Sequence, residues 1–233
     1  MKKTIAACLI LFFLTHEGSS QNKIYPDFGI WSGANLDYEL NQKFSLKFAE
    51  IFRLKENCTQ LNLLYTDIGI QYSFNKNFSQ SLIYRSINKY KKEGYFSFRH
   101  RIELDTKFKY KFSSFNLSIR ERLQGEVRDV YTSQNGHLPE FYSRTKFDLK
   151  YDFGKKFVPY ASFEARYAIR NPREVDLEET WRSRTYMGLV YKINDISDLD
   201  LYYMIQNDIK LVDIAQGDIY IVGLEYSITL GKK

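Results

Sequence analysis

Charged and apolar side chains alternate along one segment of the chain, YFSFRHRIELDTKFKYKF, residues 95–112. Its ionisable residues include Arg99, Arg101, Asp105, Lys107 and Lys109. Alternate positions of a β-strand point to the same face, so these side chains would share one surface. Arg and Lys side chains favour anions when they line a pore or a cavity. The chemistry that this segment indicates is the recognition of anionic solutes.

Residues suited to acid–base or nucleophilic catalysis are sparse. Beyond residue 20 the chain has two histidines, His100 and His137, and the second lies in a polar stretch typical of a loop. His100 lies on the apolar face of segment 95–112, where a lipid esterase would hold its general base, and Ser86 is a serine that could approach it. The nearest positions on its own face are apolar, so we favour an interfacial histidine and expect no catalytic residue and no enzyme.

Patterns that bind metals or cofactors are missing too. The sequence has no glycine-rich phosphate loop and no Cys/His ligand spacing. Acidic residues at 174–179 and 195–200 are typical of solvated loops, which bind divalent cations weakly at best. Cys58 is the single cysteine beyond residue 20, so no disulfide is expected within the exported chain. We expect no metal and no cofactor.

The first twenty residues resemble a secretory signal peptide. Lys2 and Lys3 precede an apolar stretch at 4–14, and small residues follow at 18–20. The apolar stretch is shorter than the roughly 20 residues that a membrane-spanning helix needs. We therefore predict cleavage before Gln21, export, and a single domain at 21–233.

The composition favours a membrane β-barrel over a membrane helix or a nucleic-acid-binding protein. Mean hydropathy is −0.44, yet aromatic residues make up 17% of the chain and there are only 4 prolines. Tyr and Phe favour strands and the interfacial girdles of membrane proteins. Barrel strands are only half apolar, so unremarkable hydropathy is compatible with them. The net charge of +6 is spread along the chain, so we expect no nucleic-acid partner.

The same alternation recurs along the whole chain and predicts its elements. The alternating segments lie at 28–40, 44–54, 64–74, 78–84, 95–112, 115–123, 141–153, 157–169, 181–193, 199–205 and 220–230. They predict an all-β, antiparallel transmembrane barrel of about 10–12 strands. Bacterial barrels have even strand numbers, so eleven segments leave three possibilities: 22–31 is a separate strand, it threads the lumen, or one segment is miscounted.

The connections alternate in length. Short turns lie at 41–43, 75–77, 113–114, 154–156 and 194–197, and longer links include 125–139 and 171–180. Short periplasmic turns and longer extracellular loops are typical of outer-membrane barrels. A lipocalin-like soluble barrel would show the same alternation with its apolar face inward. The many charges opposite so much aromatic surface favour the membrane barrel and a location in the outer membrane.

Three stretches carry a family resemblance: FGIWSGANLDYELNQKFSLKFAEIFRL, GIQYSFNKNFSQSLIYR and FRHRIELD. Their strand-and-turn rhythm resembles domain of unknown function 2490, an uncharacterised family of exported proteins common in Bacteroidota-type Gram-negative bacteria. The resemblance covers nearly all of the predicted mature chain. It implies the barrel fold and the outer membrane, and it implies no activity.

Short turns fix hairpin register, so cross-strand partners on the interior face can be predicted. The predicted pairs of opposite charge are Asp105 with Arg122, Arg101 with Glu126, Lys146 with Glu164, Glu140 with Arg170, Lys192 with Asp200, Arg184 with Asp208, Asp67 with Arg85, and Asp37 with Lys47. Such pairs stabilise by about 0.2–1 kcal/mol each.

Basic residues exceed their acidic partners on this face. Lys107 would oppose Arg120, Arg144 would oppose Arg166, and Arg99, Lys109 and Lys150 have no evident carboxylate. The predicted lining residues are Arg99, Arg101, Asp105, Lys107, Arg120, Arg122, Arg144, Lys146, Glu164, Arg166, Arg184, Lys192 and Asp200. A positive lumen indicates either a narrow pore for small anionic solutes or an ion-pair network that fills the barrel. Outer-membrane lipids are the other expected partners. The alternatives are a lipid hydrolase or acyltransferase, and a surface binding protein that uses its long loops.

Overall fold

The computed structural model describes residues 26–91, 93–131, 136–170, 181–209 and 218–231, and in these ranges it contains eleven strands and no helix. The strands are β1 (Asp27–Glu39), β2 (Phe44–Lys55), β3 (Gln60–Ser73), β4 (Phe78–Tyr90), β5 (Phe96–Phe112), β6 (Phe115–Arg128), β7 (Glu140–Tyr151), β8 (Phe157–Arg170), β9 (Trp181–Lys192), β10 (Ser197–Ile209) and β11 (Ile219–Gly231). The described residues include no helix long and apolar enough to span a membrane.

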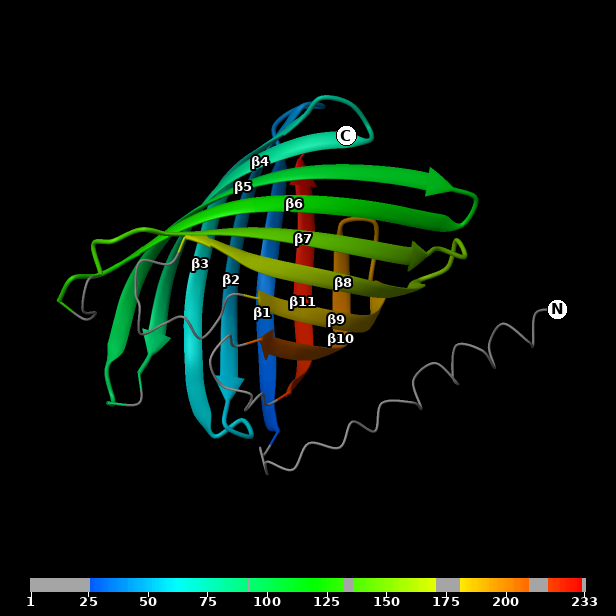
Figure 1. The fold of residues 1–233 in the computed structure, drawn as a ribbon. Coiled ribbons are helices and arrows are strands. Elements are labelled where there is room, and N and C mark those ends of the chain that lie inside the picture. The colour runs from blue at the N-terminus through cyan, green and yellow to red at the C-terminus, as the bar shows by residue number, and fades with distance from the viewer. Residues whose placement is uncertain (1–25, 92, 132–135, 171–180, 210–217, 232–233) are drawn as a thin grey trace.

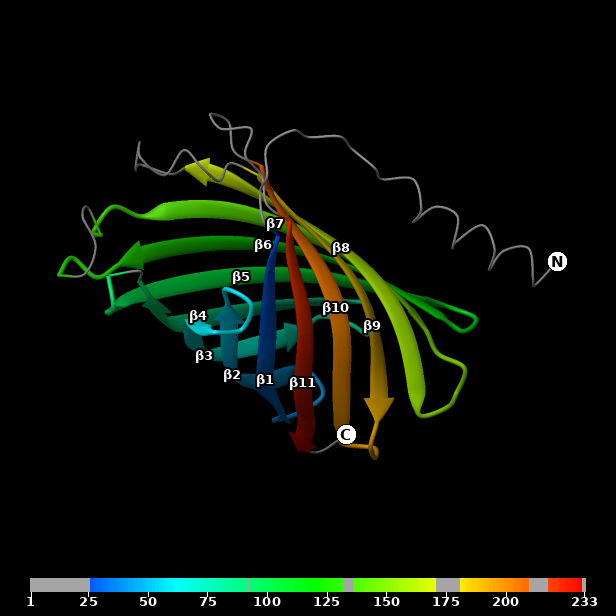
Figure 2. The same ribbon diagram turned by 90° about the horizontal axis from the view of Figure 1, so that it is seen from below.

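The eleven strands form one closed barrel in which each strand pairs with its neighbours in sequence (Figure 1). Consecutive strands are antiparallel, and the barrel closes through a parallel pair, β1 with β11. The predicted range of about 10–12 strands is therefore confirmed, with an odd count of eleven that departs from the even numbers of bacterial barrels. Residues 27–31 belong to β1, and the rest of the segment considered for a twelfth strand lies almost wholly outside the described residues. Figure 2 shows β1 and β11 side by side and running the same way.

Alternation along each strand separates an apolar outer face from a polar inner face, as β5 illustrates. Ile102 and Leu104 are 59% and 42% exposed, whereas Glu103 between them is 0% exposed. Exposed large apolar side chains recur on every strand, among them Phe48, Ile68, Leu82, Phe147, Phe163, Met187, Leu201 and Leu224. The outer face is thus a continuous apolar surface around the barrel.

Asparagine side chains shape three of the turns at one end of the barrel, called here the short-turn end. Asn41 Oδ1 accepts hydrogen bonds from the backbone N–H groups of Lys43 and Phe44, both at 2.9 Å. Asn75 plays the same part in the β3–β4 turn and Asn194 in the β9–β10 turn. Such side-chain acceptors satisfy turn N–H groups and fix the register of the strands that follow.

The links at the opposite end, called here the long-link end, are unequal in length. Residues 56–59 and 91–95 make compact turns, so the predicted contrast between the two ends is only partial. The remaining links, 129–139, 171–180 and 210–218, are longer. Residues 132–135, 171–180 and 210–217 of these links lie outside the described residues.

Large side chains fold over glycines on the inner wall. Tyr160 lies opposite Gly188 and Tyr202 opposite Gly223. A β-carbon at either glycine would overlap the facing ring, so both rings lie flat against backbone. An apolar cluster forms here from Trp31, Tyr186, Tyr202, Met204 and Ile221. It fills the β1, β9, β10 and β11 side of the interior. A smaller apolar cluster of Ile51, Tyr65 and Ile87 lies on β2, β3 and β4, and charged residues occupy much of the remaining inner wall.

Candidate functional site

The interior of the barrel holds the residues that the sequence singled out. Arg99, Arg101, Asp105, Lys107, Arg120, Arg122, Arg144, Lys146, Glu164, Arg166, Arg184, Lys192 and Asp200 all occupy inward-facing positions of their strands. They do not form one site, because they lie at different heights along the strands, from the long-link end to the short-turn end.

Three buried glutamates organise the middle of the interior, and each one contacts three arginines. Glu103 contacts Arg85 (3.5 Å), Arg101 (3.5 Å) and Arg122 (2.5 Å); Glu126 contacts Arg99 (2.9 Å), Arg101 and Arg128 (4.0 Å); Glu164 contacts Arg120 (2.8 Å), Arg144 (2.5 Å) and Arg184 (3.1 Å). All three glutamates are 3% exposed or less. Because three guanidiniums share its one carboxylate, the Glu164 cluster carries excess positive charge. Around Glu103 and Glu126 the charges balance, because Arg101 is shared and three of the other arginines also pair with the carboxylates of Asp67, Asp105 and Glu140.

Facing pairs of aspartate and arginine add to the clusters. Asp67 accepts two hydrogen bonds from Arg85, and Asp105 accepts two from Arg122, each at 2.6 Å. Bidentate pairs of this kind are among the stronger protein hydrogen bonds. Asp67 with Arg85, Asp105 with Arg122, Arg101 with Glu126, and Asp37 with Lys47 are the predicted pairs that the structure forms.

The other predicted pairs differ from the structure for local reasons. In the β9–β10 hairpin, Lys192 faces Asp198 and Arg184 faces Gln206, because the turn closes at Ser197 and is tighter than expected. A bulge at Phe141 and Tyr142 displaces Arg170 from its predicted partner Glu140. Lys146 does face Glu164, but its ion pair is with Asp148 at 2.9 Å.

One expectation about charge excess also changes. Arg99 does have a carboxylate partner, Glu126, at 2.9 Å. Lys107 faces Arg120 and Arg144 faces Arg166 as expected. Glu103 was missed, although it shares the alternating face of segment 95–112, because its arginines lie on two neighbouring strands and its own, within reach of long side chains.

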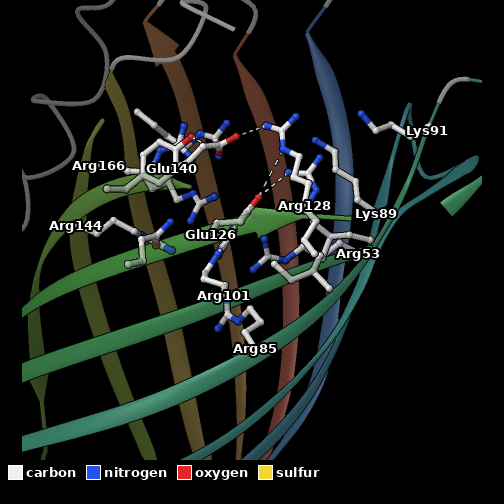
Figure 3. Close-up of a pocket in the computed structure, with 17 residues that line it drawn as sticks. Arg53, Arg85, Lys89, Lys91, Arg101, Glu126, Arg128, Glu140, Arg144 and Arg166 are labelled. Carbon is white, nitrogen blue, oxygen red and sulfur yellow. Dashed lines mark hydrogen bonds and ion pairs between the residues drawn. The ribbon is translucent and has the colours of Figure 1, made fainter. Parts of the chain in front are cut away.

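A cavity of about 330 Å³ opens above the glutamate clusters, toward the long-link end. Its basic lining residues are Arg53, Arg85, Lys89, Lys91, Arg99, Arg101, Arg128, Arg144, Arg166, Arg182 and Arg184; its acidic ones are Glu126 and Glu140. Figure 3 shows Arg144 and Arg166 on one side of this space, Arg53 and Lys89 on the other, and Glu126 between them. We call it the basic cavity.

The basic cavity has a floor. Beneath it the side chains of Glu103 and Met204 are completely buried. The charged clusters close one side of the interior and the apolar cluster around Trp31 closes the other. The interior is therefore closely packed near its middle.

Three arginines of the cavity lining stack on aromatic rings. The guanidinium carbon of Arg53 lies 3.5 Å from the centre of the Trp31 ring, and that of Arg184 lies 5.1 Å from it. Arg85 stacks on the Tyr65 ring at 3.9 Å. Cation–π contacts of this kind hold a positive charge in place without a carboxylate.

The half of the interior near the short-turn end carries acidic as well as basic groups. Tyr160 donates a hydrogen bond to Asp200 at 3.0 Å, and Tyr202 donates one to Glu225 at 3.1 Å. At the end itself, Lys192 Nζ lies 3.0 Å from Asp152 in the turn after β7, and this hydrogen bond lowers the pKa of the Asp152 carboxyl.

His100 lies on the outer face of the barrel. Its Nδ1 is 2.6 Å from the Tyr84 hydroxyl. The centres of the His100 and Phe98 rings are 4.6 Å apart, and the two rings are nearly perpendicular. Ser86 is its register partner on β4, but no hydrogen bond joins the two side chains in the described structure. No group of three or more His, Cys, Asp or Glu side chains in the described ranges has metal-binding geometry.

Two carboxylates on the outer face were not foreseen. Glu121 accepts hydrogen bonds of 2.5 Å from the hydroxyls of Ser143 and Thr145, and Glu50 accepts one of 2.5 Å from Thr66. The alternation could have identified both glutamates, because each one occupies a position of its strand that belongs to the apolar face. Hydroxyl donors from neighbouring strands satisfy these charges locally.

Comparison with known proteins gives a family and a fold resemblance. No curated protein matches the chain. Among solved structures, a NanC porin in a rhombohedral crystal form is 11% identical, with a TM-score of 0.49 over 77% of this chain and 85% of that chain. That likeness is too loose to support an argument about function. The family model described as a protein of unknown function, DUF2490, matches residues 28–210. The chain therefore belongs to the DUF2490 family.

Proposed function

We propose that this protein is an outer-membrane barrel that admits small anionic solutes to its interior, as a narrow anion-favouring pore. The observation that carries the proposal is the basic cavity, with its eleven basic and two acidic lining residues. A concentration of one sign of charge in a concave, low-dielectric wall raises the local concentration of counter-charged solutes.

The apolar outer face supports the membrane location. Side chains such as Ile68 and Ile102, each 59% exposed, would be costly in water around the whole circumference of the barrel. In an outer membrane they contact lipid, and the short-turn end faces the periplasm. The basic cavity then opens toward the cell exterior.

Passage through the barrel must involve its packed middle. Ions would cross where arginines share the carboxylates of Glu103 and Glu164, so the conductance is expected to be small. The competing possibility, a filled barrel that conducts nothing, rests on the same packing. Electrical recording separates the two.

The test is planar-bilayer recording of the purified, folded protein with a salt gradient. Anion preference should be high at low salt and should weaken at high salt, because the Debye length falls from about 10 Å at 0.1 M to about 3 Å at 1 M. Neutralising Lys89 and Lys91 together, both in the lining of the basic cavity, should reduce the preference. Cation preference would refute the proposal, and absence of any conductance would favour the filled barrel.

A lipid hydrolase is the second candidate, and the register of β4 and β5 is what favours it. Ser86 is the partner of His100 on the outer face, with the Tyr84 hydroxyl 2.6 Å from His100 Nδ1. The test is incubation of the folded protein with phospholipid vesicles and, separately, with a fluorophosphonate probe. Fatty-acid release and labelling that are both lost in Ser86→Ala would support it; an unlabelled, inactive protein would exclude it.

A further inference from the structure

Arg53, in the lining of the basic cavity, has a charge that no carboxylate neutralises. Within the described ranges no acidic side chain lies within ion-pairing distance of it. Its one side-chain hydrogen bond goes from Nη2 to the Tyr65 hydroxyl at 3.2 Å, and its Nε is buried without an acceptor. The faces of Trp31 and Tyr65, with centres 3.5 Å and 5.0 Å from the guanidinium carbon, hold it in place.

Two further arginines share these rings. Arg85 stacks on Tyr65 and Arg184 on Trp31, so three positive charges gather around two aromatic side chains. Like charges brought together in a partly desolvated space repel one another, and an anion placed among them would relieve the repulsion. Arg85 and Arg184 already bind carboxylates, which leaves Arg53 as the free anchor for such an anion.

We propose that the basic cavity is a binding site for a small, hydrophilic oxyanion with two or more negative groups, anchored by Arg53. This inference rests on the proposed function only in requiring that solutes reach the cavity. Arginine outnumbers lysine in the lining nine to two, and its planar fork suits carboxylate and phosphate oxygens better than it suits halides.

The size and shape of the cavity limit the ligand further. Its volume of about 330 Å³ is near the lower end of the range for ligand pockets, about 300–1,000 Å³. Arg144 and Arg166 face Arg53 and Lys89 across the space (Figure 3), so a ligand with two separated negative groups can contact both sides. A monovalent anion reaches one side only. The cavity lies in the interior of the barrel, and the wall of strands separates it from the surrounding lipid. The ligand is therefore a free solute and not a lipid headgroup.

The test uses the folded, full-length mature protein in a non-ionic detergent. Isothermal titration calorimetry would compare citrate and pyrophosphate with acetate and chloride at matched ionic strength. We expect citrate or pyrophosphate to bind at one molecule per barrel, and acetate and chloride to bind at least about tenfold more weakly. Arg53→Gln should weaken citrate or pyrophosphate binding by about 10- to 100-fold, the loss expected for one charge-assisted contact.

Lys47→Gln is the matched control. Lys47 pairs with Asp37 at 3.0 Å near the short-turn end and does not line the basic cavity, so its loss removes the same charge at a distance. Its affinity should equal that of the unmodified protein. Equal losses in the two variants would show general electrostatics and would overturn the site, as would equal affinity for citrate, pyrophosphate and acetate.

A fluorescence experiment keeps the proposal testable if Arg53→Gln does not fold. The chain has 2 tryptophans, so Trp181→Phe leaves Trp31, on which Arg53 stacks, as the sole emitter. Citrate should change Trp31 emission and chloride at equal ionic strength should not; unchanged emission would overturn the site. Binding without conductance would refute the pore alone, whereas anion conductance without citrate or pyrophosphate binding would refute this inference alone.

Discussion

Replacing Glu164 by glutamine is the most direct test of the interior as described. Glu164 is 3% exposed and its carboxylate contacts Arg120, Arg144 and Arg184 at 2.8, 2.5 and 3.1 Å. Glutamine keeps the size of the side chain and removes its charge. Three closely spaced guanidiniums then lack the carboxylate that they share.

The magnitude follows from opposing contributions. Each attraction is worth about 4 kcal/mol between charges about 4 Å apart at an effective dielectric constant of about 20. Desolvation of the carboxylate and repulsion among the three arginines offset most of that gross sum. Removal of one partner from a buried ion pair costs about 3–5 kcal/mol. We therefore expect Glu164→Gln to lower the free energy of unfolding by about 3–5 kcal/mol.

The assay is urea unfolding of the barrel folded into lipid vesicles, followed by the shift in gel mobility between folded and unfolded protein. Adding Arg144→Gln to Glu164→Gln should recover part of the loss, because one uncompensated charge is then removed. Additive losses in the double variant, or a cost of Glu164→Gln below about 1 kcal/mol, would show that the carboxylate does not hold these arginines together.

Three further predictions concern the outer face, the inner wall and the short-turn end. Leu123→Arg, near the middle of β6 on the outer face, should impair folding into vesicles by about 2–4 kcal/mol because it puts a charge into lipid, whereas inward-facing Lys109→Gln should be tolerated; equal effects would mean that the faces are reversed. Gly223→Val should lower the urea midpoint, by about 1–3 kcal/mol in stability, because its side chain overlaps the facing tyrosine ring, and a wild-type midpoint would contradict that packing. The lowered pKa of Asp152 means that its bond to Lys192 stabilises the fold above the ordinary aspartate pKa of about 3.9 and that this stability is lost as the pH falls through the lower, folded-state value. Lys192→Gln should weaken that dependence in acid titrations monitored by circular dichroism, and an unchanged acid transition would exclude the linkage.

Alternation predicted the strands because their two faces meet different surroundings. Ile102 and Glu103 are neighbours in sequence and lie on opposite sides of the barrel wall, so the period of two identified both the element and its orientation. The parallel closure of β1 on β11 could not be predicted this way. The direction in which the first and last strands pair depends on how the whole sheet curls. No turn joins these two strands, so no local sequence signal indicates that direction.

Register was predictable only where a turn had one plausible centre. The two-residue link between β5 and β6 allows a single pairing, and Asp105 meets Arg122 as expected. In the β9–β10 turn, Asn194 Oδ1 accepts hydrogen bonds from the Ile196 N–H and the Ser197 hydroxyl. The turn is therefore tighter than predicted, and Lys192 faces Asp198 instead of Asp200. The three-arginine clusters were beyond prediction, since long side chains choose partners diagonally as well as directly opposite.

The same charges that would attract an anion also oppose its passage. Arg184 lines the basic cavity and also contacts Glu164 beneath it, so one guanidinium serves both the binding surface and the packed middle. Conduction requires sites that bind strongly enough to admit an ion and weakly enough to release it. A multivalent oxyanion held by Arg53 and the opposite wall meets the first condition better than the second. If both proposals hold, citrate or pyrophosphate added on the long-link side should therefore block the current carried by chloride, and this block should weaken in Arg53→Gln.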